Sequence, residues 1–564
     1  MTIDSMKKTK FPTRTYSDWQ QAAEKAIKGK PFEETLKTPT IEDVTLEPLY
    51  TKDMLDQLGD YVPAQVAAIQ HGKHQPSWLV SQEVMADSAQ EYLSLMKDDI
   101  LRGNETVVYT GFHKFDWTNE QLIELAEMIV QYPIYFKLTG DDQNILRVFD
   151  FVAPEHLPQV QGVIFSEETV KAPDNVRTQL VDTVPIHHAG GTAVHELGVA
   201  LSILSERMED ADFSNTAKNT WIRFAIDTQF FQEIAKLRAF RVLWQAFSSA
   251  YGQEAPTIPI FTETSVRSYS KLDPYVNLLR AGNSTFAAVL GGTDAHTVHP
   301  HDFLTAPDPS SRRIARNVQL VIKEEAHVSH VIDPAAGSYF IETLTKEYVE
   351  AAWNYFLEIE EAGGYSEVIK SGWLTDDIQA KWIEREKNVA TRKQSLIGTN
   401  IYANPQEPVK DAKIDDGHLE YMTAKRLATP FENLRAQSKV TTLKSAIVLV
   451  EPLKKIKAQI DFVSGFLAVG GIEPLISTYL ATAEEINQFL ADENIDYAVL
   501  CGSKEAVAAI IPQLKADACI DLAGKYPKEQ LSEWAEFGIR DTLYSGKHMT
   551  AKLEKILALG KEAL

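Results

Sequence analysis

Two adjacent histidines give this sequence its first candidate for chemistry. His187 and His188 follow the apolar run that begins at Val181, and a small-residue turn comes next at 189–192. Imidazole side chains can act as general acids or bases near neutral pH. Because successive residues of a strand point to opposite faces, at most one of the two could face a site. The alternative, which we favour, is that both are hydrogen-bonded structural residues at a strand end.

A second cluster of histidines and carboxylates spans residues 294–302. Its histidines are His296, His299 and His301. Nitrogen and oxygen ligands of this kind could hold a metal ion for hydrolysis. Their spacing matches no specific zinc signature, however, and Pro300 favours an irregular surface loop. We therefore expect a loop packed at a domain or subunit interface, with metal binding as the alternative.

Both clusters lie within a long alternation of apolar strands and amphipathic helices. Eight segments are predicted as strands, namely Trp78–Val84, Val107–Thr110, Ile134–Lys137, Gly162–Phe165, Val181–His187, Ile222–Ile226, Ile258–Thr262 and Ala287–Leu290. Eight repeats with short connections predict a parallel (β/α)₈ TIM barrel. Such barrels carry their chemistry at the carboxyl ends of the strands, so both clusters stand where a site belongs.

The carboxyl-terminal part predicts a second α/β domain. Its expected strands are Ala446–Val450, Pro474–Thr478, Tyr497–Cys501, Cys519–Leu522 and Thr542–Tyr544, with a last helix from Thr550 to Ala563. Five strand–helix repeats indicate a flavodoxin-like doubly wound sheet. We divide the chain into an N-terminal arm at 1–45, the barrel with trailing helices at 46–394, a belt-like linker at 395–440 and the flavodoxin-like domain at 441–564. A helix capped by Ser17 is expected in the arm.

Composition excludes several classes of protein. The net charge of −23 over 564 residues argues against nucleic acid as a partner. No run of about 18 apolar residues indicates a membrane span, and residues 1–15 lack the apolar region of a secretory signal. Cys501 and Cys519 are expected to be reduced. Together these features predict a cytoplasmic chain without membrane or nucleic-acid partners.

Several segments resemble the cobalamin-dependent acyl-CoA mutases, and methylmalonyl-CoA mutases in local detail. They are Phe230–Ala239, Arg313–Gln319, Val331–Pro334 with Gly337-Ser338, and Leu396–Gly398. That family also has the order of barrel, belt and flavodoxin-like domain. The segment Glu47-Pro48-Leu49-Tyr50-Thr51 looks most like the small (β) subunit of the two-chain bacterial members, in which a catalytic large chain pairs with a small chain that has no active site.

One departure from the family pattern falls at the fifth strand. Catalytic members read Tyr-His-Met-Gln-Glu-Ala-Gly-Ala-Thr there, and the His can hydrogen-bond the substrate thioester. Alignment on 189–192 places Pro185 where that His belongs, and proline has no side-chain donor. Losing such a donor removes several kcal/mol of transition-state stabilisation. The resemblance therefore implies that this chain has no catalytic residue here and that side chains pack its barrel.

A second departure falls in the flavodoxin-like domain. Cobalamin-binding members carry Asp-x-His-x-x-Gly after the first strand, and this His coordinates cobalt. Here Val450 is followed by Glu451-Pro452-Leu453, and the only histidine in residues 440–564 is His548. The resemblance implies that the fold persists without cofactor-binding residues.

We therefore expect the small, non-catalytic subunit of a heterodimeric mutase that interconverts (R)-methylmalonyl-CoA and succinyl-CoA. The resemblance places adenosylcobalamin and the acyl-CoA substrate on the large (α) catalytic subunit, the expected partner. Three alternatives remain: an active mutase with a drifted site that uses His187 or His188, a metal-dependent hydrolase that uses the His296–Asp302 loop, and a regulatory partner of another acyl-CoA mutase.

Overall fold

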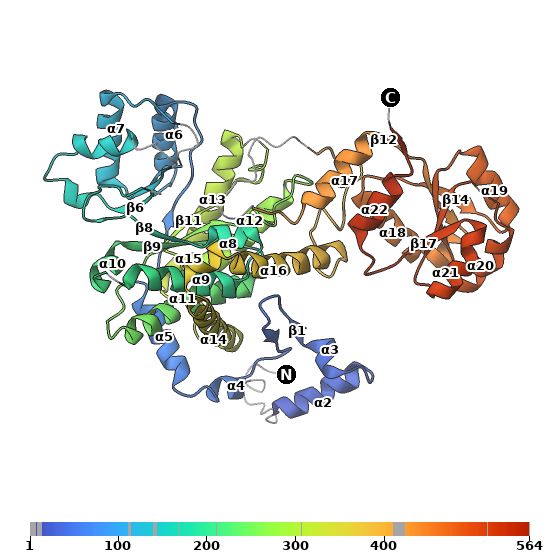
Figure 1. Cartoon of the computed structure of the whole chain (residues 1–564), viewed down its shortest axis with the longest axis horizontal. Coiled ribbons are helices and arrows are strands. Elements are labelled where there is room, and N and C mark those ends of the chain that lie inside the picture. The colour runs from blue at the N-terminus through green and yellow to red at the C-terminus, as the bar shows by residue number, and fades with distance from the viewer. Residues whose placement is uncertain are drawn as a thin grey trace.

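Two α/β units make up the protein, with an N-terminal arm beside the first (Figure 1). The computed structural model describes residues 7, 14–110, 114–138, 144–166, 168–209, 211–305, 307–409, 424–515 and 517–562. Within these residues, no helix is long and apolar enough to cross a membrane.

The first unit is a parallel barrel built from two hydrogen-bonded sheets. Their strand orders are β4-β5-β6-β7 and β3-β11-β10-β9-β8. The strands are β3 (Leu79–Val80), β4 (Val107–Tyr109), β5 (Ile134–Lys137), β6 (Gly162–Phe165), β7 (Val176–Arg177), β8 (Gln179–Asp182), β9 (Thr220–Ile226), β10 (Ile260–Thr264) and β11 (Ala295–Thr297). The sheets meet where the Glu105 N–H donates to the Val80 carbonyl at 2.9 Å, and where β7 runs into β8. The predicted TIM barrel is confirmed.

Two of the predicted strands are wrong in extent or place. The fifth strand ends at Asp182, and residues 184–189 form a short helix, α8 (Val184–Ala189). The segment 287–290 is the last turn of helix α12 (Val276–Leu290), and the eighth strand is β11. A short apolar run fits a buried helix face as well as a strand, so periodicity alone could not separate them.

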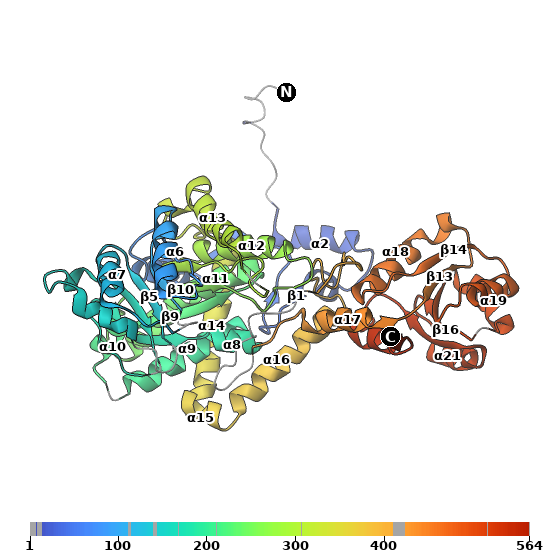
Figure 2. The ribbon, with the colours of Figure 1, turned by 90° about the horizontal axis from the view of Figure 1, so that it is seen from above.

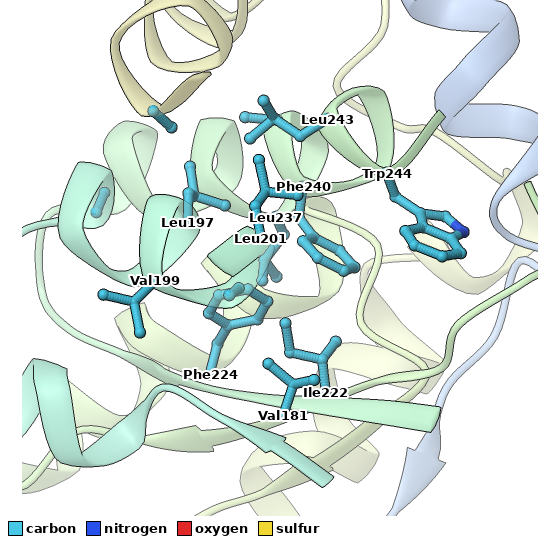
Figure 3. Packing of buried hydrophobic residues seen from close by; sticks show 14 of the residues in the cluster. Val181, Leu197, Val199, Leu201, Ile222, Phe224, Leu237, Phe240, Leu243 and Trp244 are labelled. Carbon is cyan, nitrogen blue, oxygen red and sulfur yellow. The ribbon is translucent and has the colours of Figure 1, made fainter. Parts of the chain in front are cut away.

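Helices surround the barrel, and all of them except η2 and η3 bury side chains. They are α6 (Ala89–Leu101), α7 (Asn119–Gln131), η1 (Asn144–Phe151), η2 (Leu157–Gln159), α9 (Ala193–Met208), α10 (Phe213–Asn219), α11 (Phe230–Ala250), α12, α13 (Pro309–Glu325) and η3 (Val328–His330). Leu197 of α9 and Phe240 of α11 pack with Val181, Ile222 and Phe224 of the strands (Figure 3). Each such side chain contributes about 2 kcal/mol by leaving water.

The N-terminal arm packs loosely. Its elements are α2 (Tyr16–Ala26), α3 (Phe32–Leu36) and β1 (Thr38–Pro39). At its end β2 (Thr45–Leu46) pairs with β1, and α4 (Lys52–Asp56) and α5 (Tyr61–His71) follow before β3. Thr15, and not Ser17, caps α2, because Thr15 Oγ accepts from the Asp18 N–H while the Asp18 carboxylate accepts from the Thr15 N–H. Neither α2 nor α3, both fully described, has a buried side chain.

Helices connect the barrel to the second unit (Figure 2). They are α14 (Tyr339–Glu361), α15 (Tyr365–Lys370), α16 (Trp373–Ala390) and α17 (Thr429–Lys439). Helix α17 lies inside the predicted belt, where no helix was expected. Phe431 and Leu434 bury its apolar face, and Glu432 pairs with Arg426 at 2.8 Å. Residues 410–423 of the predicted belt lie outside the described residues.

The second unit is a five-stranded parallel sheet in the order β14-β13-β15-β16-β17, which confirms the flavodoxin-like prediction. Its elements are β13 (Ser445–Leu449), α18 (Leu453–Val469), β14 (Leu475–Tyr479), α19 (Ala483–Asp492), β15 (Tyr497–Cys501), α20 (Lys504–Ile510), η4 (Ile511–Gln513), β16 (Cys519–Ala523), α21 (Lys528–Trp534), η5 (Ala535–Phe537), β17 (Ile539–Leu543) and α22 (Met549–Leu557). The last helix ends earlier than predicted, because β18 (Lys561–Glu562) pairs antiparallel with β12 (Thr441–Thr442). The domain boundaries at residues 45, 394 and 440 stay predictions.

A buried ion cluster ties three helices together. Arg238 of α11 donates to both carboxylate oxygens of Asp333 at 2.7 Å and to Glu342 Oε2 of α14 at 2.6 Å. Gln65 of α5 donates to the same Glu342 oxygen at 2.6 Å, and the Gly337 N–H donates to Glu342 Oε1 at 2.9 Å. Arg238 and Asp333 come from two of the family-like segments, so these distant stretches meet at one structural cluster.

We expect Arg238→Met to lower the free energy of unfolding by about 3–5 kcal/mol, because two carboxylates would remain buried without their cation. Urea denaturation followed by circular dichroism measures the change. Arg313→Met, at an exposed position of α13, is the control, and its free energy of unfolding should stay close to that of wild type. A loss below about 1 kcal/mol for Arg238→Met, the range of a surface ion pair, would show that the cluster does not hold the helices.

Candidate functional site at the carboxyl end of the barrel

The helix α8 positions both histidines of the first cluster. Asp182 Oδ1 accepts from the Val184 N–H at 3.1 Å and so starts the turn. Pro185 fits the first helical turn, where a missing N–H costs no hydrogen bond. Because the segment is helical and not extended, the expectation that only one histidine faces inward is wrong: His187 and His188 are both buried.

His187 sits in a chain of hydrogen-bonded groups. Its Nδ1 lies 2.8 Å from Glu196 Oε1 and its Nε2 lies 2.8 Å from Ser265 Oγ. A serine, histidine and acid in this order can activate a nucleophile. Ser265 is only 3% exposed, however, and its Oγ also accepts the Arg267 N–H. Burial holds the pKa of His187 well below its usual value, and the positive charge of Arg267 lowers it further. A neutral His187 thus links α8, α9 and the end of β10.

Buried cations surround this chain of groups. Lys236 Nζ lies 3.1 Å from both oxygens of Glu196 and 2.6 Å from Glu233 Oε2. Burial alone would lower the pKa of Lys236, but the two carboxylates outweigh it and raise that pKa. Arg267 pairs with Asp227 at 2.8 Å. The buried groups therefore compensate each other in charge.

Two arginines fix the small-residue turn that follows α8. Arg267 donates to the carbonyls of His187 and Gly191 at 2.9 Å each. Arg385 of α16 donates to the carbonyls of Gly190 at 3.1 Å and Gly191 at 3.0 Å. Gly190 has φ +121°, a conformation that side chains disfavour, so the glycine is needed for this geometry. The strand-tip motif is thus a clamped structural turn.

Aromatic side chains pack the inside of the barrel below this level. Tyr135 of β5 contacts Trp221 of β9 and Phe261 of β10, with ring centroids 5.7 and 5.6 Å apart. Because β5 belongs to one sheet and β9 and β10 to the other, these contacts cross the barrel. The interior is packed at this level, as the sequence predicted.

A charged network lies above the aromatic layer. Arg223 of β9 donates to the Tyr135 hydroxyl at 3.2 Å and to Asp182 Oδ2 at 2.7 Å, and lies 3.7 Å from Glu263. His299 Nε2 lies 3.7 Å from the same Glu263. Burial alone would raise the pKa of Glu263, but Arg223 and His299 outweigh it and lower that pKa. This end of the barrel therefore holds an internal ion-pair network.

Two further charged residues of the network, Glu83 and Lys137, are less firmly paired. His299 Nδ1 lies 3.7 Å from Glu83 Oε2, and burial raises the pKa of Glu83. Lys137 at the end of β5 has no hydrogen bond or ion pair with any described residue. Burial lowers its pKa, and the positive charge of Arg223 lowers it further.

The structure separates the three histidines of the metal candidate. His296 belongs to the eighth strand, not to a loop after it, and lies 2.7 Å from Thr262 Oγ and 3.2 Å from Thr285 Oγ. His299 faces Glu263, and His301 stacks on Tyr275 with centroids 5.2 Å apart. Across the described parts of the chain, no group of three or more His, Cys, Asp or Glu residues is arranged to hold a metal ion.

Sequence reasoning missed the charged residues that dominate this site. Arg223 and Glu263 stand inside otherwise apolar strands, and Lys236 and Glu196 lie on helices read only as amphipathic. A charge within a buried strand was the available signal, because such a group needs a partner. The partners of Arg223 and Lys236 include Asp182 and Glu196, which lie 40 or more positions away in the sequence.

The carboxyl edge of the second sheet is closed by side chains after β13 and β15. Glu451 accepts from the Ser503 N–H at 2.7 Å. A carbon placed on Gly502 would lie 2.3 Å from Val450 Cγ2, so the two loops touch. His548 is used as the N-cap of α22, where its Nδ1 accepts the Ala551 N–H at 3.4 Å.

A TIM barrel followed by a flavodoxin-like domain is the architecture of acyl-CoA mutases. The methylmalonyl-CoA mutase family profile matches residues 153–477. This chain therefore belongs to the methylmalonyl-CoA mutase family, whose members are isomerases and cobalamin-dependent in general.

Curated relatives cover almost the whole chain. The methylmalonyl-CoA mutase small subunit of Porphyromonas gingivalis is 28% identical over 557 residues, which covers 89% of this chain and 90% of that protein. The small subunit of Streptomyces virginiae is 27% identical and covers 94% and 95%. A probable small subunit of Mycobacterium bovis is 30% identical and covers 71% and 67%.

The residues at the second sheet do not fit a cobalamin bound through a histidine after its first strand. Glu451 occupies that loop and is held by Ser503, while the one histidine of the domain caps a helix. A carboxylate fixed by a backbone N–H cannot replace a neutral imidazole as a cobalt ligand.

His188 gives this site a testable pH dependence. Burial lowers its pKa to about 4, against 6.5 for an ordinary histidine. Below pH 6.5 the unfolded chain therefore binds a proton here that the folded chain does not, and the free energy of unfolding falls as pH falls. Between pH 7 and pH 5, we expect the free energy of unfolding of His188→Gln to fall by about 2 kcal/mol less than that of wild type.

Urea denaturation at several pH values measures this difference. His330→Gln is the matched control, because His330 is exposed, and it should follow the wild-type pH dependence. Equal pH dependence of wild type and His188→Gln would mean that His188 is not held neutral by the fold.

Proposed function

We propose that this chain is the small, non-catalytic subunit of a heterodimeric, adenosylcobalamin-dependent methylmalonyl-CoA mutase. The assembled enzyme interconverts (R)-methylmalonyl-CoA and succinyl-CoA, and the large subunit binds both cofactor and substrate. The observation that carries the proposal is the match over 89–94% of this chain to relatives named small subunits.

The geometry of the barrel supports a non-catalytic role. A catalytic chain needs open space along the barrel for its acyl-CoA. Here Tyr135, Trp221 and Phe261 pack across the interior, and Arg223 and Glu263 occupy the level above. Pro185 offers no donor for a thioester carbonyl. Moving Arg223 or Glu263 aside to make room would leave the other charge buried without its partner, which is costly.

Mutase turnover tests the proposal. We expect no succinyl-CoA from this chain alone with methylmalonyl-CoA and adenosylcobalamin, and turnover when the large subunit of the same organism is added in a 1:1 ratio. Pro185→His alone should not restore activity, because the barrel stays packed. Turnover by the unmodified chain alone would instead support an active mutase with a drifted site.

Cobalamin retention tests the assignment of the cofactor to the partner. After gel filtration with adenosylcobalamin, we expect this chain to emerge without the visible absorbance of the cofactor, and the large subunit or the complex to retain it. The physical reason is the occupied loop at Glu451. Stoichiometric cobalamin on the isolated small chain would contradict this assignment.

A further inference from the structure

One surface helix of the barrel presents an uncharged face to solvent. From Tyr275 through Leu290 the only charged residue is Arg280, which is buried and donates to the Ile397 carbonyl at 2.7 Å. Tyr275 is 69% exposed and Leu279 is 72% exposed. In a chain with 24% charged residues, an uncharged helix face with Leu279 exposed and Tyr275 covered only in part, by its stacking on His301, indicates an interaction surface.

The same face forms one wall of an apolar groove against α13. The groove has a volume of about 500 Å³. Gly282 and Phe286 of α12 line it on one side, and Ile314, Val318 and Val321 of α13 on the other. The helices lie next to each other on the outside of the barrel (Figure 2). Two adjacent helices with an apolar furrow between them are the geometry that accepts a third helix.

Gly282 makes the groove deep. A carbon built on Gly282 would have nothing within 4 Å, so the backbone of α12 is open to a neighbour at this point. Glycine in a helix interior costs up to about 1 kcal/mol relative to alanine. Among the residues that the structure describes, no atom lies close enough to that carbon to require a glycine here. A notch of this kind permits close approach of another helix.

The charges at the rim of the groove indicate which occupant fits. Glu324 and Glu325 are exposed at the carboxyl end of α13, and Glu325 lines the groove. The chain carries a net charge of −23, so a second copy would bring like charges together. A different chain with an apolar helix flanked by basic residues complements both the groove and its rim.

We propose that the groove between α12 and α13, lined by Gly282 and flanked on α12 by the exposed Leu279, binds an apolar helix of the large catalytic subunit. This inference rests on the proposed function, which supplies the partner, and adds the surface by which it docks. The apolar contact holds the helix, and basic side chains of the partner pair with Glu324 and Glu325.

Binding of the full-length chain to the large subunit tests the inference, with the dissociation constant measured by isothermal titration calorimetry. Leu279→Glu places a charge on the exposed face of α12, and Gly282→Trp puts a bulky side chain in the notch, where a Cβ would meet no heavy atom within 4 Å. Leu453→Glu is the matched control, because Leu453 is 54% exposed on α18 of the second unit. We expect both groove variants to weaken binding by roughly 30-fold or more, as at an interface hot spot. The control should bind as wild type does.

Each outcome separates the groove from the proposed function. Wild-type binding with unchanged affinity for both groove variants would overturn the groove and leave the proposed function in place. No binding of wild type to the large subunit would overturn the proposed function and the inference together. Self-association of this chain that Leu279→Glu abolishes, measured by analytical ultracentrifugation, would assign the groove to a second copy and overturn the inference. Unchanged circular dichroism of the variants shows that folding is not the cause.

Discussion

The buried guanidinium of Arg238 is the constraint on which the architecture depends. A cation without water needs carboxylates at short range, and Asp333 and Glu342 provide them from segments about a hundred residues away. Gln65 joins the same cluster from the arm side. Helices α5, α11 and α14 must therefore meet at one point, which fixes how the arm and the trailing helices sit against the barrel.

Inside the barrel, too, buried charges face opposite charges. Glu196 and Glu233 face Lys236, while Asp182 and Glu263 face Arg223. In many enzymes this end of a barrel is kept open and its charges are aimed at a substrate. Here the charges are aimed at each other, and an aromatic layer closes the space beneath. The side chains at this position hold one another in place through these ion pairs.

Much of the fold could be predicted from the sequence. Long alternations of apolar strands and amphipathic helices indicated the barrel and the doubly wound sheet, because burial forces these periods on the chain. The errors fell on short segments. Residues 184–187 were read as the end of an apolar strand, yet Asp182 and Pro185 start a helix there. Residues 287–290 were read as strand because four apolar residues suit either form.

The sequence by itself determined the fold class, the family resemblance and the lack of a side-chain donor at Pro185. These follow from residue identity and local period alone. Only the tertiary structure decided that His187 bonds Ser265 and Glu196, that Arg223 spans the barrel, and that α12 leaves an apolar face uncovered. The reason is physical: a side chain's charge state and partners depend on neighbours that are distant in sequence, and folding alone brings them within hydrogen-bond range.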